Sequence, residues 1–135
     1  MTRGSTRALL AGCALSAAFS VSAFDPSRWI EVDGGPWHPT PIQLSALETA
    51  LQPAVAVGSK NRGRIPNWNE YTIQYQGRFS LLAKQYILVN GFCDHEAMDV
   101  RKQWVEVFDG GACYFSAKYD PAAKRVYDLS VNGVA

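Results

Sequence analysis

The chain has 135 residues, and its 13 basic side chains nearly balance its 12 acidic ones, so the formal net charge is +1. This near-neutral charge excludes general binding to nucleic acids, which requires a strong basic excess. An aromatic content of 12% excludes an intrinsically disordered chain. We therefore expect one globular domain with its own core, no nucleic-acid partner and no cofactor.

The first residues predict export. Arg3 and Arg7 precede a long uncharged stretch that ends in the small residues Val21-Ser22-Ala23. A basic start, an apolar middle and small residues before the cleavage point are typical of a secretory signal peptide. The apolar run is too short to span a bilayer. We predict that residues 1–23 are removed after Ala23, which leaves a periplasmic or secreted protein without a transmembrane segment.

An alternative signal lies inside this leader. Leu10-Ala11-Gly12-Cys13 resembles the box at which bacterial lipoproteins are cleaved and acylated, which would anchor the protein at Cys13. However, the apolar run continues past Cys13, where a lipoprotein would have a polar tether. The pattern therefore favours cleavage after Ala23, and lipidation stays open as the alternative.

Residues 24–39 are rich in proline and glycine, which predicts an extended N-terminal arm before a single domain over residues 40–135. We expect Trp29 and Trp37 to hold this arm against the domain.

The strongest helix signal follows this arm. Thr40-Pro41-Ile42-Gln43 places a hydroxyl at the N-cap, proline at the first helical position and glutamine at the third, which is a capping box. Leucines at spacings of three and four then give one apolar stripe. Pro53 is expected to end or kink the helix, and Gly58 is expected to end the segment that follows Pro53. The stripe consists of Leu44, Leu47 and Leu51.

The second half of the chain predicts strands. Residues 70–79 and 84–92 are rich in β-branched and aromatic residues, and residues 125–131 form a last strand after a turn at Asp120-Pro121. Residues 103–119 read as a hairpin around Asp109-Gly110-Gly111, since these residues tolerate positive φ. The predicted fold is therefore α+β, with one N-terminal helix packed on a curved, four- to five-stranded antiparallel sheet.

The predicted hairpin has large apolar groups on both faces. Its register would place Phe108 opposite Cys113 and Val105 on the other face. A single helix covers only one face, so the second face would meet the N-terminal arm, a second copy in a homodimer, or an envelope protein or polymer. The N-terminal arm is the favoured cover of this second face. The same register pairs Glu106 with Phe115 and Trp104 with Ala117, and it sets Val107 and Tyr114 beside Val105.

Two cysteines, Cys93 and Cys113, remain after the leader is removed. In an oxidising compartment an even pair favours one disulfide. A plain up-and-down meander would hold their Cα atoms farther apart than the ~7 Å that a bridge permits. Either the thiols are free, or residues 94–102 run back across the sheet before the next strand begins. We favour the bridge.

Residues 93–99, CDHEAMD, collect a thiol, an imidazole and three carboxylates. On a helix His95 and Asp99 would share one face and could both reach a cation. The zinc-protease pattern needs a second histidine where Asp99 stands, and no third protein ligand is evident. Cys93 is also poorly placed to act as a nucleophile with His95. We predict a charged loop rather than a metal or catalytic site. The side chains that such a site would use are Asp94, His95, Glu96 and Asp99.

Two weaker site candidates remain. Glu106 on an apolar strand could act as a general base in a pocket, although a rim glutamate facing solvent is the more frequent outcome. A short basic segment could bind an anionic envelope polymer, although such a run is more often a solvated loop. With Trp37, the partner-binding candidates are Lys60, Arg62, Arg64 and Trp68.

The motif NGFC at residues 90–93, with residues 109–135, DGGACYFSAKYDPAAKRVYDLSVNGVA, resembles a group of small exported proteins of Gram-negative bacteria. The group has no assigned activity, so the resemblance implies no functional residue. The helix-then-sheet order also resembles the cystatin-like layout, which hosts inhibitors, binding modules and some enzymes. Fold analogy alone does not assign a function.

The sequence contains no complete catalytic constellation. We therefore expect an exported, non-enzymatic binding or accessory protein. The alternatives are a small pocket enzyme or metal-binding protein that uses Glu106 or the 94–99 cluster, and an inhibitor of an envelope or secreted enzyme.

Overall fold

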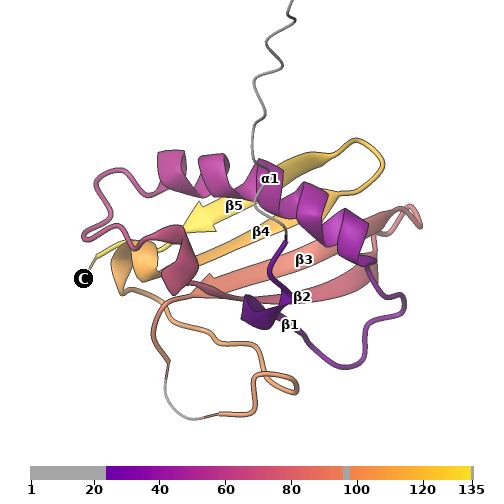
Figure 1. The fold of residues 1–135 in the computed structure, drawn as a ribbon, viewed down its shortest axis with the longest axis horizontal. Helices are drawn as coiled ribbons and strands as arrows, with labels where there is room; N and C mark the ends of the chain where they lie inside the picture. Colours follow the sequence, from indigo (N-terminus) through magenta and orange to yellow (C-terminus); the bar gives the residue numbers. More distant parts are fainter. Residues whose placement is uncertain (1–23, 96–97, 135) are drawn as a thin grey trace, which may run out of the picture.

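The computed structural model describes residues 24–95 and 98–134, and it consists of one helix on one face of an open sheet (Figure 1). The sheet has five strands in the order β1-β2-β3-β4-β5. Three short 3-10 turns, η1, η2 and η3, precede β1, β2 and β4. The elements are η1 (Pro26–Arg28), β1 (Trp29–Glu31), α1 (Pro41–Gly58), η2 (Trp68–Glu70), β2 (Thr72–Phe79), β3 (Gln85–Phe92), η3 (Gly111–Cys113), β4 (Tyr114–Asp120) and β5 (Arg125–Val131).

The predicted α+β class is confirmed, and the sheet is mixed. β2 to β5 pair antiparallel, whereas β1 runs parallel to β2. Parallel strands need a crossover connection, and α1 supplies it between β1 and β2. The predicted signal peptide and Cys13 lie outside the described residues. Within the described ranges, no helix has the length and apolar character needed to cross a bilayer.

Helix α1 begins where the sequence predicts. The Thr40 hydroxyl accepts a hydrogen bond from the Gln43 backbone N–H at 3.2 Å, and the Gln43 side chain accepts one from the Thr40 N–H at 3.0 Å. This is the expected capping box. The helix does not end at Pro53 but continues to Gly58. Its buried stripe is Leu44, Leu47, Leu51 and Val55.

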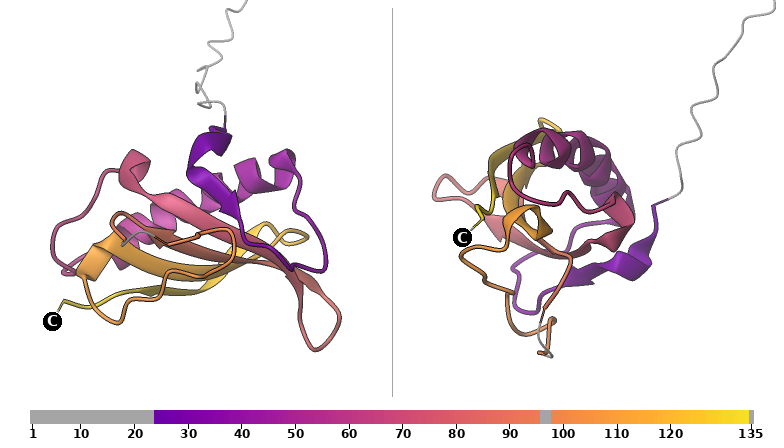
Figure 2. Two further views of the ribbon diagram at one scale, coloured as in Figure 1. Left: turned by 90° about the horizontal axis from the view of Figure 1, so that it is seen from below. Right: turned by 90° about the vertical axis from the view of Figure 1, so that its left-hand side faces the viewer.

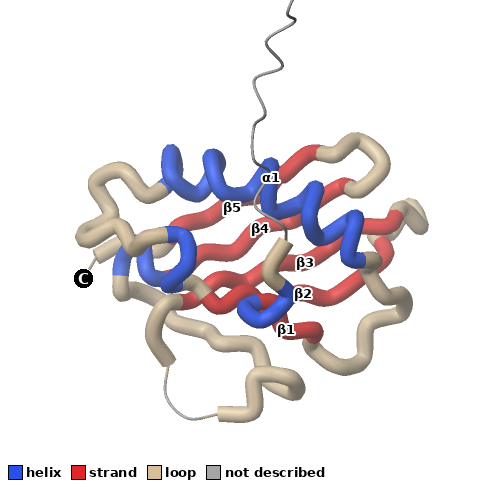
Figure 3. Tube along the Cα trace, viewed as in Figure 1, coloured by secondary structure: helices blue, strands red, loops and turns tan. Residues whose placement is uncertain are grey.

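The core lies between α1 and the sheet face that it covers (Figure 3). Alternate residues of β2, β3 and β4 point toward the helix, as strand geometry requires. Leu47 and Leu51 are fully buried at the centre. The sheet contributes Ile73, Ile87, Val89, Phe115, Ala117 and Tyr119 to this core.

Part of the segment predicted as an N-terminal arm joins the sheet as β1. Trp29 starts β1 and is buried in the core, with 6% of its surface exposed. The Trp37 indole N–H donates to the Arg78 carbonyl oxygen at 2.7 Å. Gly77 permits this approach, because a Cβ there would lie 2.3 Å from the Trp37 carbonyl oxygen. Both tryptophans therefore hold the segment to the body, as expected.

The predicted hairpin over residues 103–119 is wrong. β4 begins at Tyr114 and pairs with β3, while residues 103–108 form no strand. Gly110 and Gly111 do adopt positive φ, at 87° and 65°, but they lead into η3 rather than a two-residue hairpin turn. Gly111 also packs against the loop after α1, where a Cβ would lie 2.3 Å from the Arg62 carbonyl oxygen. The predicted pairing of Phe108 with Cys113 therefore does not form. The predicted pairings of Glu106 with Phe115 and of Trp104 with Ala117 do not form either.

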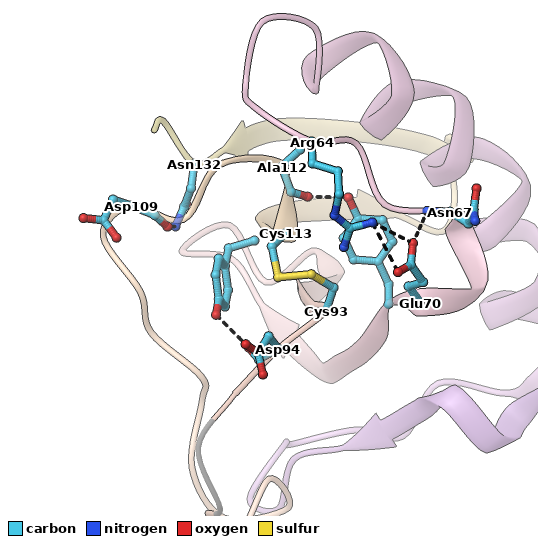
Figure 4. The surroundings of a disulfide bond; sticks show 11 residues. Arg64, Asn67, Glu70, Cys93, Asp94, Asp109, Ala112, Cys113 and Asn132 are labelled. Carbon is cyan, nitrogen blue, oxygen red and sulfur yellow. Dashed lines mark hydrogen bonds and ion pairs between the residues drawn. A yellow bond between two sulfur atoms is a disulfide. The ribbon is translucent and has the colours of Figure 1, made fainter. Parts of the chain in front are cut away.

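The predicted Cys93–Cys113 disulfide is confirmed, with 5.0 Å between the Cα atoms (Figure 4). The bridge forms because β3 and β4 are sheet neighbours, with Phe92 opposite Tyr114. The long connection between these strands leaves the sheet, crosses its other face and returns. This is the non-trivial connection on which the predicted bridge depends.

The last strand is irregular. The register between β4 and β5 shifts between Ser116 and Lys118, and Asp128 has a φ of 50°. An extra residue in one strand of a pair is a β-bulge, which bends and twists that strand. β5 therefore forms a distorted edge of the sheet.

Candidate binding surface

The loop that connects β3 to β4 crosses the sheet face opposite α1 (Figure 2). Gln74 of β2 is the main anchor, and none of its surface is exposed. Its side-chain amide donates to the carbonyl oxygens of Val100, at 2.8 Å, and Gln103, at 2.6 Å. Its oxygen accepts from the Val105 backbone N–H at 2.9 Å. One strand side chain therefore replaces the backbone partners that a neighbouring strand would supply.

Two asparagines fix the rest of this loop. The Asn90 amide donates to the Gln74 side-chain oxygen at 3.0 Å and to the Val105 carbonyl oxygen at 2.8 Å. The Asn132 amide donates to the carbonyl oxygens of Val107, at 2.5 Å, and Asp109, at 2.9 Å. The loop thus covers part of the second face, which was predicted to be covered by the N-terminal arm.

The N-terminal segment does cover the outer part of that face. The Gln76 amide donates to the carbonyl oxygen of Asp33 at 2.8 Å, and Gln76 is buried. Gln74 and Gln76 are two residues apart in β2, so they point to the same face. One glutamine holds the loop and the other holds the segment after β1.

Two shallow clefts flank Val105 on this face. The first has a volume of about 260 Å³ and the second about 240 Å³. They share Asn90, Val105 and Glu106, so the two clefts adjoin, and we call them together the strip. The first also contains Val107, Phe108, Tyr114, Phe115, Ser116 and Asn132, and the second also contains Arg78, Leu88, Val89 and Trp104.

The strip presents aromatic and charged groups together. The Arg78 guanidinium lies 5.6 Å from the centre of the Trp104 ring, which is a cation–π contact. Farther along the same face, the Lys118 ammonium lies 5.6 Å from the Tyr86 ring centre and 3.4 Å from an Asp128 carboxylate oxygen. These arrangements can recognise a polar, extended ligand, because they offer apolar area beside hydrogen-bonding groups.

The basic segment predicted as a partner site lies elsewhere, in the loop after α1. Lys60 and Arg62 are exposed there. Arg64 pairs with Glu70 at 3.3 Å, and the Asn67 backbone N–H donates to the same carboxylate at 2.5 Å (Figure 4). The Asn67 hydrogen bond, followed by the Arg64 interaction, lowers the pKa of Glu70. Arg64 is thus engaged within the protein.

Trp68 is partly buried and packs against the core. Its indole N–H donates to a Glu48 carboxylate oxygen at 2.8 Å, and its ring stacks on Phe115 with 6.2 Å between centres. Arg28 bonds the same carboxylate at 3.2 Å and the Trp68 carbonyl oxygen at 2.8 Å. The structure therefore does not bring Trp37, Trp68 and the basic residues into one site.

The described residues of the 93–99 cluster make local contacts. His95 is exposed, and its ring packs edge-on against Phe92 at 4.6 Å between centres. Asp99 accepts a hydrogen bond from the Arg101 backbone N–H at 3.1 Å, which closes a local turn. Glu96 lies outside the described residues. Across residues 24–95 and 98–134, no group of three or more metal-ligating side chains is placed to hold a metal ion.

Sequence reasoning missed the anchors of the loop. A glutamine in the middle of a predicted strand, at Gln74, and an asparagine at Asn90 are unusual where apolar residues would be buried. Their position opposite one another in the β2–β3 register is the signal that could have identified them. Comparison with protein-family models found no match, and comparisons with curated proteins and with solved structures found no significant match either.

Proposed function

We propose that this protein is an exported, non-enzymatic binding or accessory module that recognises an envelope partner through the sheet face opposite α1. The observation that carries the proposal is the strip formed by the two clefts around Val105. The strip joins an arginine–tryptophan pair to exposed strand residues, and interfaces favour such arginine and aromatic groups.

The shape of the strip favours an extended segment of a protein partner. Each cleft is shallow and smaller than the ~300 Å³ at which enclosed small-molecule pockets begin. Because the clefts adjoin, a chain lying across the loop can contact Leu88 and Trp104 in one and Phe108 in the other. A fully exposed phenylalanine, such as Phe108, is a side chain that a partner would cover.

Site-specific photo-cross-linking tests this proposal. A photoreactive residue at Leu88 samples the strip, and one at Val57 samples the opposite side of the molecule, on α1. We expect one partner from a cell-envelope extract to cross-link from position 88. Trp104→Ala should abolish that product, whereas Lys60→Ala should retain it. Equal products from positions 57 and 88, or a product unaffected by Trp104→Ala, would count against the strip. A product that contains a second copy of the chain would identify the partner as a homodimer.

A second candidate function is a small pocket enzyme that uses Glu106 as a general base. It is supported by the position of Glu106, which lines both clefts. Against it, the Glu106 side chain is exposed, and it is the only carboxylate among the described residues that line either cleft. Incubation of an envelope extract with the protein or with Glu106→Gln, followed by mass spectrometry, distinguishes the two. A product that requires Glu106 would favour the enzyme.

A further inference from the structure

One end of the molecule carries an apolar tip. The turn between β2 and β3, the turn between β4 and β5, and the start of α1 all lie at this end (Figure 1). A cleft of about 420 Å³, lined by side chains of all three elements, shows that they adjoin. We call this region the hairpin end, and it comprises Ile42, residues 79–84 and residues 120–125.

The hairpin end exposes the largest run of apolar side chains in the described chain. Leu81 and Leu82 have 106% and 82% of their surface exposed, and Phe79 beside them has 47%. Ile42, at the first turn of α1, is 82% exposed. The β2–β3 turn also extends beyond the rest of the sheet (Figure 2). Turns ordinarily select glycine, proline, asparagine or aspartate, so two adjacent leucines at a tip need another reason.

The turn itself is well formed. The Ser80 N–H donates to the Lys84 carbonyl oxygen at 2.9 Å, and the Ala83 N–H donates to the Ser80 carbonyl oxygen at 2.9 Å. The Lys84 N–H donates to the Ser80 hydroxyl at 3.2 Å. Three of the five backbone N–H groups of residues 80–84 are therefore satisfied within the turn, which lowers the cost of moving it out of water.

The charges around this tip are mostly positive. Lys84 follows the leucines in the first turn, and Lys124 and Arg125 close the second, and all three are exposed. The one acid in these turns, Asp120, accepts hydrogen bonds from the Ala122 and Ala123 backbone N–H groups at 2.9 and 3.1 Å. The apolar tip is therefore accompanied by a net positive charge, although the whole chain is nearly neutral.

We propose that the hairpin end docks peripherally on an anionic lipid surface, with Leu81 and Leu82 entering the interfacial layer. Lys84, Lys124 and Arg125 then face the anionic headgroups, the combination that interfacial binding uses. A protruding tip fits a deformable lipid layer without a matching cavity, whereas a protein partner would need a groove of that shape. This site is separate from the strip on the sheet face, so either proposal can fail without the other.

Vesicle co-sedimentation tests the proposal. Residues 24–135, which lack the predicted apolar leader, are mixed with phosphatidylcholine vesicles with or without phosphatidylglycerol. We expect sedimentation with the anionic vesicles and release by added salt. The double variant Leu81→Ser/Leu82→Ser should lower the partition coefficient about tenfold or more, because it removes the inserted apolar area. Lys84→Glu/Lys124→Glu should abolish the preference for anionic vesicles.

Val57→Ser and Lys60→Glu are the matched controls, because both change exposed residues at or just after the C-terminal end of α1, away from the hairpin end. Each should sediment like the unsubstituted protein. Far-ultraviolet circular dichroism confirms that all variants are folded. The proposal is overturned if the protein sediments with neither vesicle, or if Val57→Ser removes binding as fully as the leucine variant does. A protein cross-link from a photoreactive residue at position 81, in a protein that binds neither vesicle, would instead assign the tip to a protein partner.

Discussion

Gln74 is a buried amide whose hydrogen bonds all serve other segments. It has 0% exposure and contacts Val100, Gln103, Val105 and Asn90 through its side chain. A buried amide with every partner satisfied specifies one arrangement of the groups around it, because any slip leaves several polar groups unpaired. The position of the strip therefore depends on this residue.

Replacing Gln74 with leucine should destabilise the protein by about 2 kcal/mol or more, since the Val105 N–H and the Asn90 amide lose a buried partner. The measurement is the urea midpoint, together with hydrogen exchange at Val105. Gln85→Leu is the control, because Gln85 is an exposed residue of β3. An unchanged midpoint in the Gln74 variant would show that the loop is not anchored there.

The lowered pKa of Glu70 predicts a specific acid response. Its ordinary value is 4.5, and the Asn67 N–H and Arg64 favour the charged form in the folded state. The folded pKa is below the unfolded one, so this stabilisation is present above pH 4.5 and is lost as the pH falls through the folded value.

We expect Glu70→Gln to be less stable than the unsubstituted protein at neutral pH, and the difference to shrink as the pH falls below 4.5. Thermal unfolding across this range measures the difference. Gln85→Leu, which changes no titratable group, should show no such convergence. A pH-independent difference for Glu70→Gln would contradict the linkage.

At the scale of elements, the disulfide closes the loop that crosses the sheet. Cys93 and Cys113 are 20 residues apart, so in the chain-entropy model the bridge contributes about 3 kcal/mol. We expect Cys93→Ser/Cys113→Ser to lower the free energy of unfolding by about 3 kcal/mol. The loop amides should exchange faster than those of β2 and β3, which remain paired to each other. Equal acceleration in β2, β3 and the loop would show that the bridge supports the whole fold rather than the crossing.

The elements with local signals were predictable. The Thr40 capping box fixed the start of α1, and turn residues fixed the start of β5 at Arg125. The irregular course of residues 103–108 was not predictable, because their alternating apolar pattern is typical of a strand. Side chains distant in the sequence hold them in a loop instead. Gln74, Asn90 and Asn132 lie 15 to 31 residues away in sequence from the loop residues that they bind. Short-range patterns carry no record of such partners.

The candidate surface was predictable only in outline. The apolar residues on both faces of the predicted hairpin indicated that one helix could not cover both faces of the sheet. The sequence therefore predicted a second cover for the other face. The cover is the β3–β4 loop and part of the N-terminal segment, as the bonds of Gln74 and Gln76 show. The clefts lie where that loop leaves the sheet face uncovered, and tertiary contacts determine the path of the loop.

At the scale of the whole molecule, four tryptophans report on different regions. Trp29 lies in the core, Trp37 near the hairpin end, Trp68 beneath α1 and Trp104 on the crossing loop. Because one core joins the helix to all strands, we expect a single cooperative transition. Fluorescence and far-ultraviolet circular dichroism should therefore give the same urea midpoint, and Trp104→Phe should leave both curves superimposed. An early fluorescence change that disappears in Trp104→Phe would show that the loop detaches first.

The irregular last strand has a consequence for how the protein behaves when concentrated. An open sheet has two free borders, and each is a template for stacking with other molecules. Here one border is the three-residue β1, and the other is bent by the bulge near Asp128. Neither offers a long, flat row of unpaired amides. Fibre growth through the borders of the sheet is therefore disfavoured, and self-association has to use side chains instead of backbone pairing.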